Sequence, residues 1–242
     1  MTTTKQCSVN SVNYKIPAKL LSEGYSNAKT KKNTRETLIL YLSPAKQNSK
    51  GINLCPKASM GCLMACLYTA GHGKFTNTQN ARMNRTEYYL ADRFLFLEQI
   101  ASEINKKAKK TNGELAIRLN GTSDVKLVEM ITSMYEIANN VVFYDYTKIP
   151  TKAGDKVLPS GHRYMVCFSR SEDNEQTALE ILQNGGVVSM VFAKELPSEY
   201  KGFKVIDGDD RDDLMLDCQH STIIGLKAKG DAKKDKSGFV IQ

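Results

Sequence analysis

The sequence predicts a single-domain α/β fold, a complete or partial β/α barrel of about six to seven mostly parallel strands. Three observations predict this class. Short apolar segments suited to buried strands recur along the chain, helical or loop segments separate them, and polar residues follow directly after most of them. A flat doubly wound sheet is the alternative, because sequence alone does not show whether a parallel sheet closes.

The expected strands follow a polar lead-in over residues 1–34, and the barrel-like domain spans residues 35–242. The first strand is the apolar segment 36–43, which ends at Pro44. The others lie at 113–124 with its polar end, 140–147, 163–171, 187–193, 202–210 and 221–230. Because helices or loops separate these strands, we expect them to pair in parallel.

Three helices are expected between the strands. The first runs from about residue 77 to 110, where apolar residues recur at intervals of three and four: Leu90, Phe94, Leu97, Ala101, Ile104 and Ala108. Ser123 or Asp124 can cap the second, which carries Val128, Ile131, Met134, Tyr135 and Ala138. The third runs from about residue 174 to 182 and stops at Asn184, Gly185 and Gly186.

Composition indicates a cytoplasmic globular protein with one basic half. Apolar residues make up 41% and charged residues 25% of the 242, no segment is apolar enough to span a membrane, and the N-terminus lacks a signal-peptide pattern. The net charge is +8, and residues 1–113 carry 18 Lys and Arg against 6 Asp and Glu. This half could bind an anionic small molecule or a nucleic acid, or it could be an ordinary solvated surface.

The segment "NLCPKASMGCLMACLYTAGHGKF" gives the clearest chemical signal, because it places Cys55, Cys62 and Cys66 within one loop, residues 51–75. Clustered thiols in a reducing compartment are more often metal ligands than disulfides. Three thiolates after a strand can hold a [4Fe-4S] cluster and leave its fourth iron open. Zinc bound by the three cysteines and His72 is the main competitor. A redox dithiol is disfavoured because no C-x-x-C pair is present, and three unliganded cysteines are the remaining alternative.

Polar residues at the other strand ends provide the candidate ligand site, because such ends gather at one face of a β/α fold. The candidates are Asn120, Gly121, Ser123, Asp124, Asp145, Arg170, Asp207 and Asp209. Most residues of this kind in α/β proteins form caps and turns, so the signal is their convergence with the cysteines. We find no P-loop, dinucleotide-binding glycine motif, nucleophile elbow or H-E-x-x-H helix.

Seven segments together resemble a known family. They are residues 41–75, "NARMNRTEYY", "IRLNGTSD", "FYDYTK", "FSRSEDNE", "VIDGDDRDD" and "IIGLKAKGDAKKDKSGFV". They resemble the bacteriophage family of gene product 88, over nearly the whole chain from Thr37 onward. This resemblance implies a phage-encoded protein that works in the host cytoplasm, and it brings no established activity.

The cysteine loop is also distantly similar to radical SAM enzymes, which hold a [4Fe-4S] cluster by three cysteines after the first strand of a partial barrel. The spacing differs, since that superfamily typically has C-x3-C-x2-C with an aromatic residue before the last cysteine, and here Tyr68 follows Cys66. The Gly-Gly-Glu segment of those enzymes is absent, and only Gly121 carries over. The resemblance therefore implies cluster binding more directly than chemistry on S-adenosylmethionine.

For an enzyme, this resemblance implies roles for the strand-end residues. Asn120, Ser123 and Asp124 would contact methionine or ribose, and Tyr144 or Tyr146 would stack on adenine. Arg170 would pair with a carboxylate, and Asp145, Asp207 and Asp209 would be substrate contacts or acid/base groups. The leading hypothesis is thus a phage [4Fe-4S] protein, with radical SAM-like catalysis as one form of it. The alternatives are a non-catalytic iron-sulfur protein that binds nucleic acid and a zinc-stabilised module.

Overall fold

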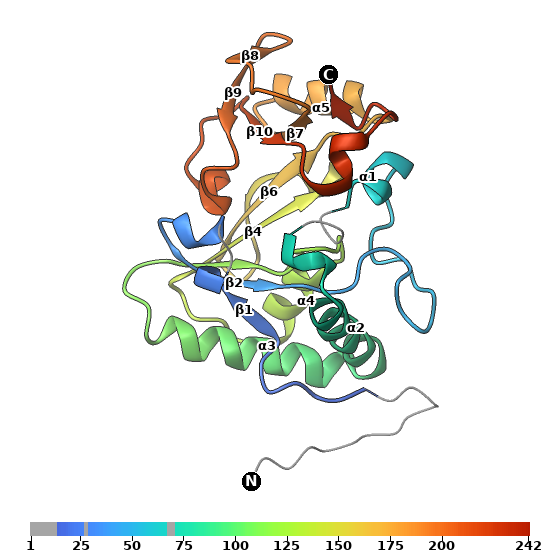
Figure 1. The fold of residues 1–242 in the computed structure, drawn as a ribbon. Helices are drawn as coiled ribbons and strands as arrows, with labels where there is room; N and C mark the ends of the chain where they lie inside the picture. Colours follow the sequence, from blue (N-terminus) through green and yellow to red (C-terminus); the bar gives the residue numbers. More distant parts are fainter. Residues whose placement is uncertain (1–13, 27–28, 67–70) are drawn as a thin grey trace.

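The computed structural model describes residues 14–26, 29–66 and 71–242, and these form one mixed sheet with helices beside it (Figure 1). The strand order is β1-β2-β3-β4-β6-β7-β10-β9-β8, with β5 beside β6 and β11 beside β7. The strands are β1 Leu21–Glu23, β2 Glu36–Leu40, β3 Leu115–Arg118, β4 Val141–Thr147, β5 Gly154–Val157, β6 Arg163–Ser169, β7 Val188–Phe192, β8 Glu199–Tyr200, β9 Phe203–Asp207, β10 Ile223–Lys227 and β11 Val240–Ile241.

The centre of the sheet is parallel, as expected from the sequence. β2, β3, β4, β6, β7 and β10 follow one another in chain order and pair in parallel. β9 also pairs in parallel with β10, and β11 with β7. These central strands read as continuous apolar segments because both of their faces are buried.

The prediction of a complete or partial β/α barrel is wrong. Among the described residues the sheet is open: it ends at β1 and at β8, which do not pair with each other. β1 lies antiparallel to β2 and β8 antiparallel to β9, so short strands from elsewhere occupy the edges that a barrel would have to join. The alternative prediction was a flat doubly wound sheet. The sheet is open, as that alternative requires, but its strand order does not reverse at the centre as in a doubly wound sheet.

The helices are α1 Met60–Met64, α2 Thr76–Ala91, α3 Arg93–Ala108, α4 Leu127–Met134 and α5 Glu175–Gln183. The single helix expected over residues 77–110 is two helices, because Asp92 leaves helical geometry and its side chain accepts a hydrogen bond from Leu95 N at 3.1 Å. The N-cap of α4 is Lys126, so neither Ser123 nor Asp124 caps it. Single-turn 3-10 helices include η4 Gly71–Lys74, η6 Asp212–Leu216 and η7 Gly230–Lys234.

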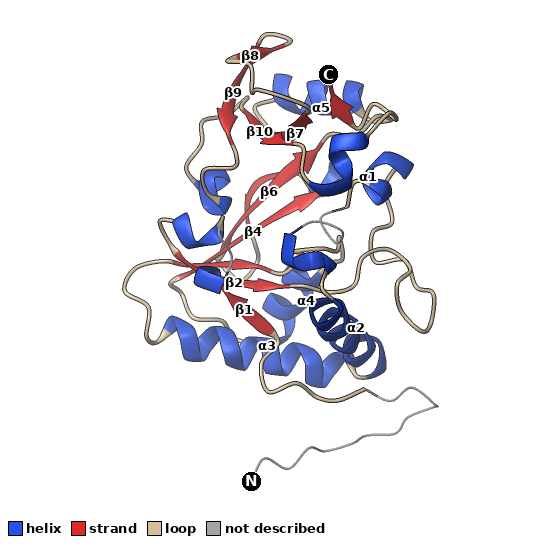
Figure 2. Cartoon of the chain, in the orientation of Figure 1, coloured by secondary structure: helices blue, strands red, loops and turns tan. Residues whose placement is uncertain are grey.

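The two faces of the sheet are covered differently. Figure 2 shows α2, α3 and α4 gathered at the end of the molecule that holds β1 and β2, with α5 at the opposite end beside β7. The large core contains Leu38, Ile117, Phe143 and Tyr164 of the sheet with Phe96, Ile100, Ile104 and Ile131 of the helices. On the other face Ala116, Val142, Tyr144, Met165 and Cys167 pack against Met215 and Leu216 of η6. Around these residues the second face is covered by η6.

Candidate functional site

The cysteine loop is held in place by a carboxylate that follows β6, at the same edge of the sheet. The Glu172 carboxylate, which follows β6, accepts hydrogen bonds from the Ser59 hydroxyl at 2.8 Å and from Gly61 N at 2.7 Å. Gly61 fits tightly, since a Cβ there would lie 2.7 Å from the Phe239 Cβ. No side chain can replace the glycine without moving the loop, so the start of α1 has a fixed position.

The three thiols of the loop are partly buried and electrostatically linked. The Cys55 Sγ accepts a hydrogen bond from Ala45 N at 3.3 Å and lies 3.7 Å from the Thr122 carbonyl oxygen. Burial, with smaller contributions from the neighbouring Cys66 and Cys62 thiols, raises the pKa of Cys55 to about 11, against the opposing effect of the hydrogen bond from Ala45 N. Burial and Cys66 also raise the pKa of Cys62. Each thiolate would therefore oppose the ionisation of its neighbours.

Lys148 supplies a positive charge at this place. It directly follows β4, and its ammonium group hydrogen-bonds to Cys62, which lowers the pKa of that thiol against the effect of burial. The same ammonium lies 3.4 Å from the Ser169 carbonyl oxygen and 5.4 Å from the centroid of the Phe239 ring. A cation fixed beside a thiol favours its thiolate form, which is the form that binds metals.

The donor set can be compared with what a metal needs. Across the described ranges, no three His, Cys, Asp or Glu side chains are already grouped as a metal site. Chemically the residues fit an iron-sulfur cluster, because three cysteine sulfurs are soft metal ligands. Two hydrogen-bond donors, Ala45 N and the Lys148 ammonium, point to these sulfurs, and the apolar ring of Phe239 lies next to Lys148. Full ligation requires the Cys55 sulfur to give up its contact with Thr122.

His72, the candidate fourth ligand, lies in η4 and is exposed, with its ring centroid 5.6 Å from that of Phe75. Residues 67–70, which link α1 to η4 and include Tyr68, lie outside the described residues. Ligation by His72 remains a prediction.

The loop from Asn120 to Asp124 lies directly against the cysteine loop. Gly121 N donates to the Leu40 carbonyl at 3.0 Å, and Asp124 N donates to the Leu54 carbonyl at 2.8 Å. A Cβ on Gly121 would lie 2.7 Å from the Leu40 carbonyl oxygen, so only glycine allows this approach. Of the predicted cofactor-binding positions, Asp124 therefore joins this loop to the cysteine loop through its backbone, and Gly121 joins it to the end of β2.

The side chains of this second loop are mostly occupied within the protein. The Asn120 Oδ1 accepts from the Ser123 hydroxyl at 3.0 Å, and the Asn120 Nδ2 donates to Asp145 at 3.0 Å. Asp124 accepts from the Thr147 hydroxyl and from Lys148 N, and forms an ion pair with Lys152 at 2.9 Å. These bonds fix the rim of the sheet next to the cysteines.

The four catalytic candidates are spread over the structure. Asp145 is 1% exposed and accepts hydrogen bonds from Asn120 N and from the Tyr164 hydroxyl. Burial raises the pKa of Asp145 to about 7, against the opposing effects of Arg118 and of the hydrogen bonds from Asn120. The Asp145 carboxyl therefore changes its charge near physiological pH. Its hydrogen-bond partners, Asn120 and Tyr164, are themselves buried, so these bonds stabilise the fold.

The other three candidates also have partners inside the protein. The Arg170 guanidinium donates to the Phe239 carbonyl at 3.0 Å and pairs with Glu175 at 2.6 Å. Asp207 accepts from Asp209 N at 2.8 Å, and the Asp209 carboxylate pairs with Lys229 at 2.7 Å. Arg170 thus holds the segment that packs on Gly61, whereas the two aspartates lie at the end of β9.

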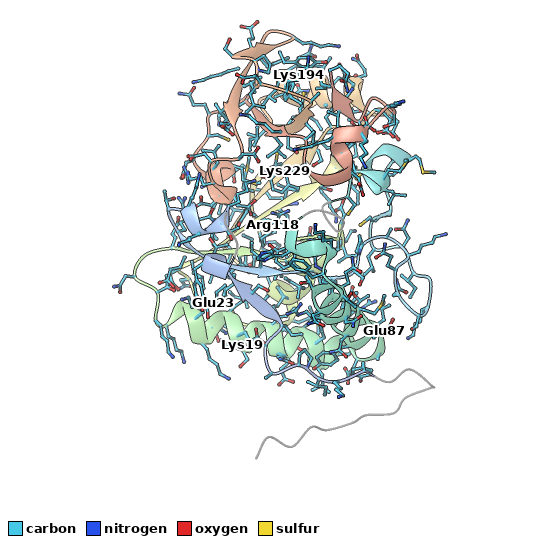
Figure 3. All side chains as sticks on the ribbon, viewed as in Figure 1. Lys19, Glu23, Glu87, Arg118, Lys194 and Lys229 are labelled. Atoms are coloured by element: carbon cyan, nitrogen blue, oxygen red, sulfur yellow. The ribbon has the colours of Figure 1, made fainter. Side chains whose placement is uncertain are left out.

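Tyr144 and Tyr146 face the side of the sheet that η6 covers, where a buried charge cluster lies. The Tyr144 hydroxyl donates to Asp212 at 3.0 Å, and the Arg118 guanidinium pairs with Asp212 at 2.9 Å and stacks 4.7 Å from the Tyr146 ring centroid. Although burial favours the neutral acid, Arg118 and Lys29 hold the pKa of Asp212 below its usual range. Figure 3 shows Arg118 near the middle of the molecule, with Lys229 above it.

Sequence reasoning missed Glu172 and this charge cluster, and it counted Lys148 among the polar strand ends without giving it a role. The signal for Lys148 was its position directly after a predicted strand, at the same rim as the cysteines. Glu172 is 111 residues from Gly61, and Asp212 is 94 from Arg118, and no motif connects either pair.

Comparison with known proteins places the chain in one family. The model of the family described as Gene product 88 matches residues 19–242, so the chain belongs to this family and the predicted phage origin of the family is confirmed. No curated protein and no solved structure matches, and none of these comparisons supports the resemblance to radical SAM enzymes. In the part of the chain that the structure describes, no helix is long and apolar enough to cross a membrane.

Proposed function

We propose that this phage protein is an iron-sulfur protein of the host cytoplasm that binds a [4Fe-4S] cluster through Cys55, Cys62 and Cys66. The observation that carries the proposal is the placement of three partly buried thiols in the one loop that follows β2, with a backbone N–H donating to the Cys55 sulfur and the Lys148 ammonium beside Cys62. Neighbouring thiolates repel one another, so the ionised form of such thiols is unfavourable on its own. A bound metal centre compensates their negative charge and stabilises the thiolates.

The surroundings of the sulfurs support iron-sulfur over zinc. Ala45 N and the Lys148 ammonium are hydrogen-bond donors to sulfur, and such donors tune the potential of iron-sulfur clusters. Structural zinc instead requires four ligands, and the fourth candidate, His72, is exposed with its ring against Phe75. A bound cluster would supply one-electron transfer or an iron that a small ligand can reach.

The protein's own residues would position the ligands. Glu172 and Gly61 fix the start of α1, which carries Cys62, and the backbone bond from Asp124 to Leu54 fixes the loop next to Cys55. Asp124 in turn holds the backbone of Lys148. Two sets of hydrogen bonds, one through Glu172 and one through Asp124, therefore position the cation and the segments that carry two of the sulfurs.

Anaerobic reconstitution with iron and sulfide tests the proposal. Wild-type protein should be brown, absorb broadly near ~400 nm, and give a paramagnetic resonance signal after reduction with dithionite. The variant with Cys55, Cys62 and Cys66 all changed to serine should remain colourless. A colourless wild type that instead holds stoichiometric zinc would overturn the proposal. The same sample, incubated with S-adenosylmethionine, shows whether reduced protein releases 5′-deoxyadenosine, which is the mark of radical SAM chemistry.

A further inference from the structure

Helix α2 brings two arginines to the end of β2. The Thr86 hydroxyl accepts a hydrogen bond from Ser43 N at 2.8 Å and donates to the Arg82 carbonyl oxygen at 2.9 Å. The Arg82 Cζ lies over the Tyr41 ring, 5.1 Å from its centroid. Arg85 comes three residues after Arg82, so the two side chains are neighbours on one side of the helix.

Two polar atoms in this place are buried and unsatisfied. Arg85 Nε and the Ser43 hydroxyl are shielded from water and have no hydrogen-bond partner among the residues that the structure describes. Ser43 is 0% exposed, and its backbone N–H is already bonded to Thr86. A buried donor without an acceptor is unfavourable, so such atoms in a native protein indicate a ligand that accepts their hydrogen bonds.

The carboxylates of this region already have partners. Burial lowers the pKa of Arg85, with a further contribution from Arg82, and Glu103 opposes this shift. Both Glu103 oxygens, however, accept hydrogen bonds from backbone N–H groups at the start of β1. Glu87, the one acidic residue of α2, is bonded through both oxygens to Ser49. Within the described ranges Arg85 forms no ion pair.

From this arrangement we infer that Arg82, Arg85 and Ser43 form a binding site for a phosphate group, either inorganic phosphate or a phosphate monoester. A guanidinium group that stacks on an aromatic ring keeps its in-plane N–H groups available to phosphate oxygens. The dianion compensates two positive charges and supplies acceptors for Arg85 Nε and the Ser43 hydroxyl. The site follows a parallel strand, where open α/β sheets bind their ligands, and it does not depend on the proposed cluster.

A terminal phosphate fits this site better than a nucleic-acid backbone does. Ser43 is 0% exposed and Arg82 8%, whereas Arg85 is half-buried and can be reached from solvent. A phosphodiester carries a sugar on each side and is bound by side chains along a surface. A phosphate monoester can instead enter with its free end first. A carboxylate would bring only one negative charge to the two arginines.

Thermal unfolding of the full chain at pH 8 and constant ionic strength tests this site. Inorganic phosphate at about ten times its dissociation constant should raise the melting temperature of wild type by about 3–6 °C. Adenosine should give no shift. A larger shift with adenosine monophosphate than with phosphate would identify a monoester as the ligand, and an equal or smaller one would identify free phosphate. No shift with either compound, or an equal shift with acetate or with an oligonucleotide that lacks a terminal phosphate, would overturn the inference.

Arg85→Met separates a binding role from a structural one. Methionine fills similar space without a buried charge, so the variant should melt above wild type in phosphate-free buffer. Calorimetry should show that it binds phosphate roughly tenfold or more weakly. Arg93→Met is the matched control, because Arg93 lies over the Tyr89 ring at 5.1 Å but is exposed. This control loses the same charge and should bind phosphate like wild type.

Ser43→Ala provides a second test that leaves both arginines in place. It removes the unsatisfied hydroxyl, so the variant should keep its melting temperature in phosphate-free buffer and bind phosphate several times more weakly. Lower stability of Arg85→Met than of wild type without phosphate would make Arg85 a structural residue and overturn the site. Equal phosphate affinities of Ser43→Ala and wild type, or of Arg85→Met and Arg93→Met, would overturn it as well.

Discussion

Replacing Asp145 with asparagine should remove a pH dependence of stability that the wild-type protein carries. Asp145 is 1% exposed, and burial raises its pKa from 3.8 to about 7. The folded protein therefore binds one more proton than the unfolded chain between these two values. The resulting stability is fully present below pH 3.8 and is lost as the pH rises through 7.

The size of this effect follows from the pKa difference. A rise from 3.8 to about 7 corresponds to about 4 kcal/mol, at about 1.4 kcal/mol for each tenfold change in proton affinity. The asparagine side chain of the variant would carry no charge at any pH, but it could not accept all the hydrogen bonds that Asn120 and Tyr164 donate. That loss costs about 1–3 kcal/mol and is independent of pH.

Urea unfolding followed by circular dichroism at pH 4 to 8 measures the difference. Wild type should exceed Asp145→Asn in free energy of unfolding by about 1–3 kcal/mol at pH 4, and the difference should fall by about 4 kcal/mol by pH 8, where the variant becomes the more stable protein. Asp210→Asn removes a carboxylate that is 67% exposed and serves as the control. Curves of wild type and Asp145→Asn that stay parallel from pH 4 to 8 would refute the reasoning.

Three further predictions concern the cysteine loop. Gly61→Ala should move α1, because the added Cβ would overlap Ser237 and Phe239. The reconstituted variant should then hold less than half the iron of wild type. Full iron content in the variant would contradict a role for this close approach. Lys148→Met removes the cation beside Cys62 and should lower the reduction potential of the cluster in a redox titration, so an unchanged potential would count against that contact. His72→Ala should keep the cluster spectrum, because this side chain is exposed, and loss of the spectrum would make His72 a ligand.

Much of the sheet could be predicted from the sequence because its central strands are apolar on both faces. All seven expected strands are present, from β2 to β10. The strands that were missed are short or half exposed, such as β5, whose side chains alternate in burial. Closure could not be predicted, because it depends on what pairs with the edges, and here β1 occupies the edge of β2.

The site was predictable only in part, for a physical reason. The position of the cysteines after a strand could be read directly, since both features are local in sequence. Polar residues after other strands could not be sorted by sequence into ligand contacts and structural anchors: Asp124 and Arg170 both hold neighbouring segments. The role of Glu172 could not be predicted from the sequence, because its partner, Gly61, is distant in the chain and bonds through its backbone N–H.

The most direct test of the central claim is the iron and acid-labile sulfide content of single cysteine variants after anaerobic reconstitution. Wild type should hold about four of each per chain. Cys55→Ser, Cys62→Ser and Cys66→Ser should each lose most of both, whereas Cys167→Ser and Cys218→Ser, which change cysteines elsewhere on the sheet and beside η6, should match wild type. Equal iron and sulfide in all five variants would contradict a cluster held by this loop.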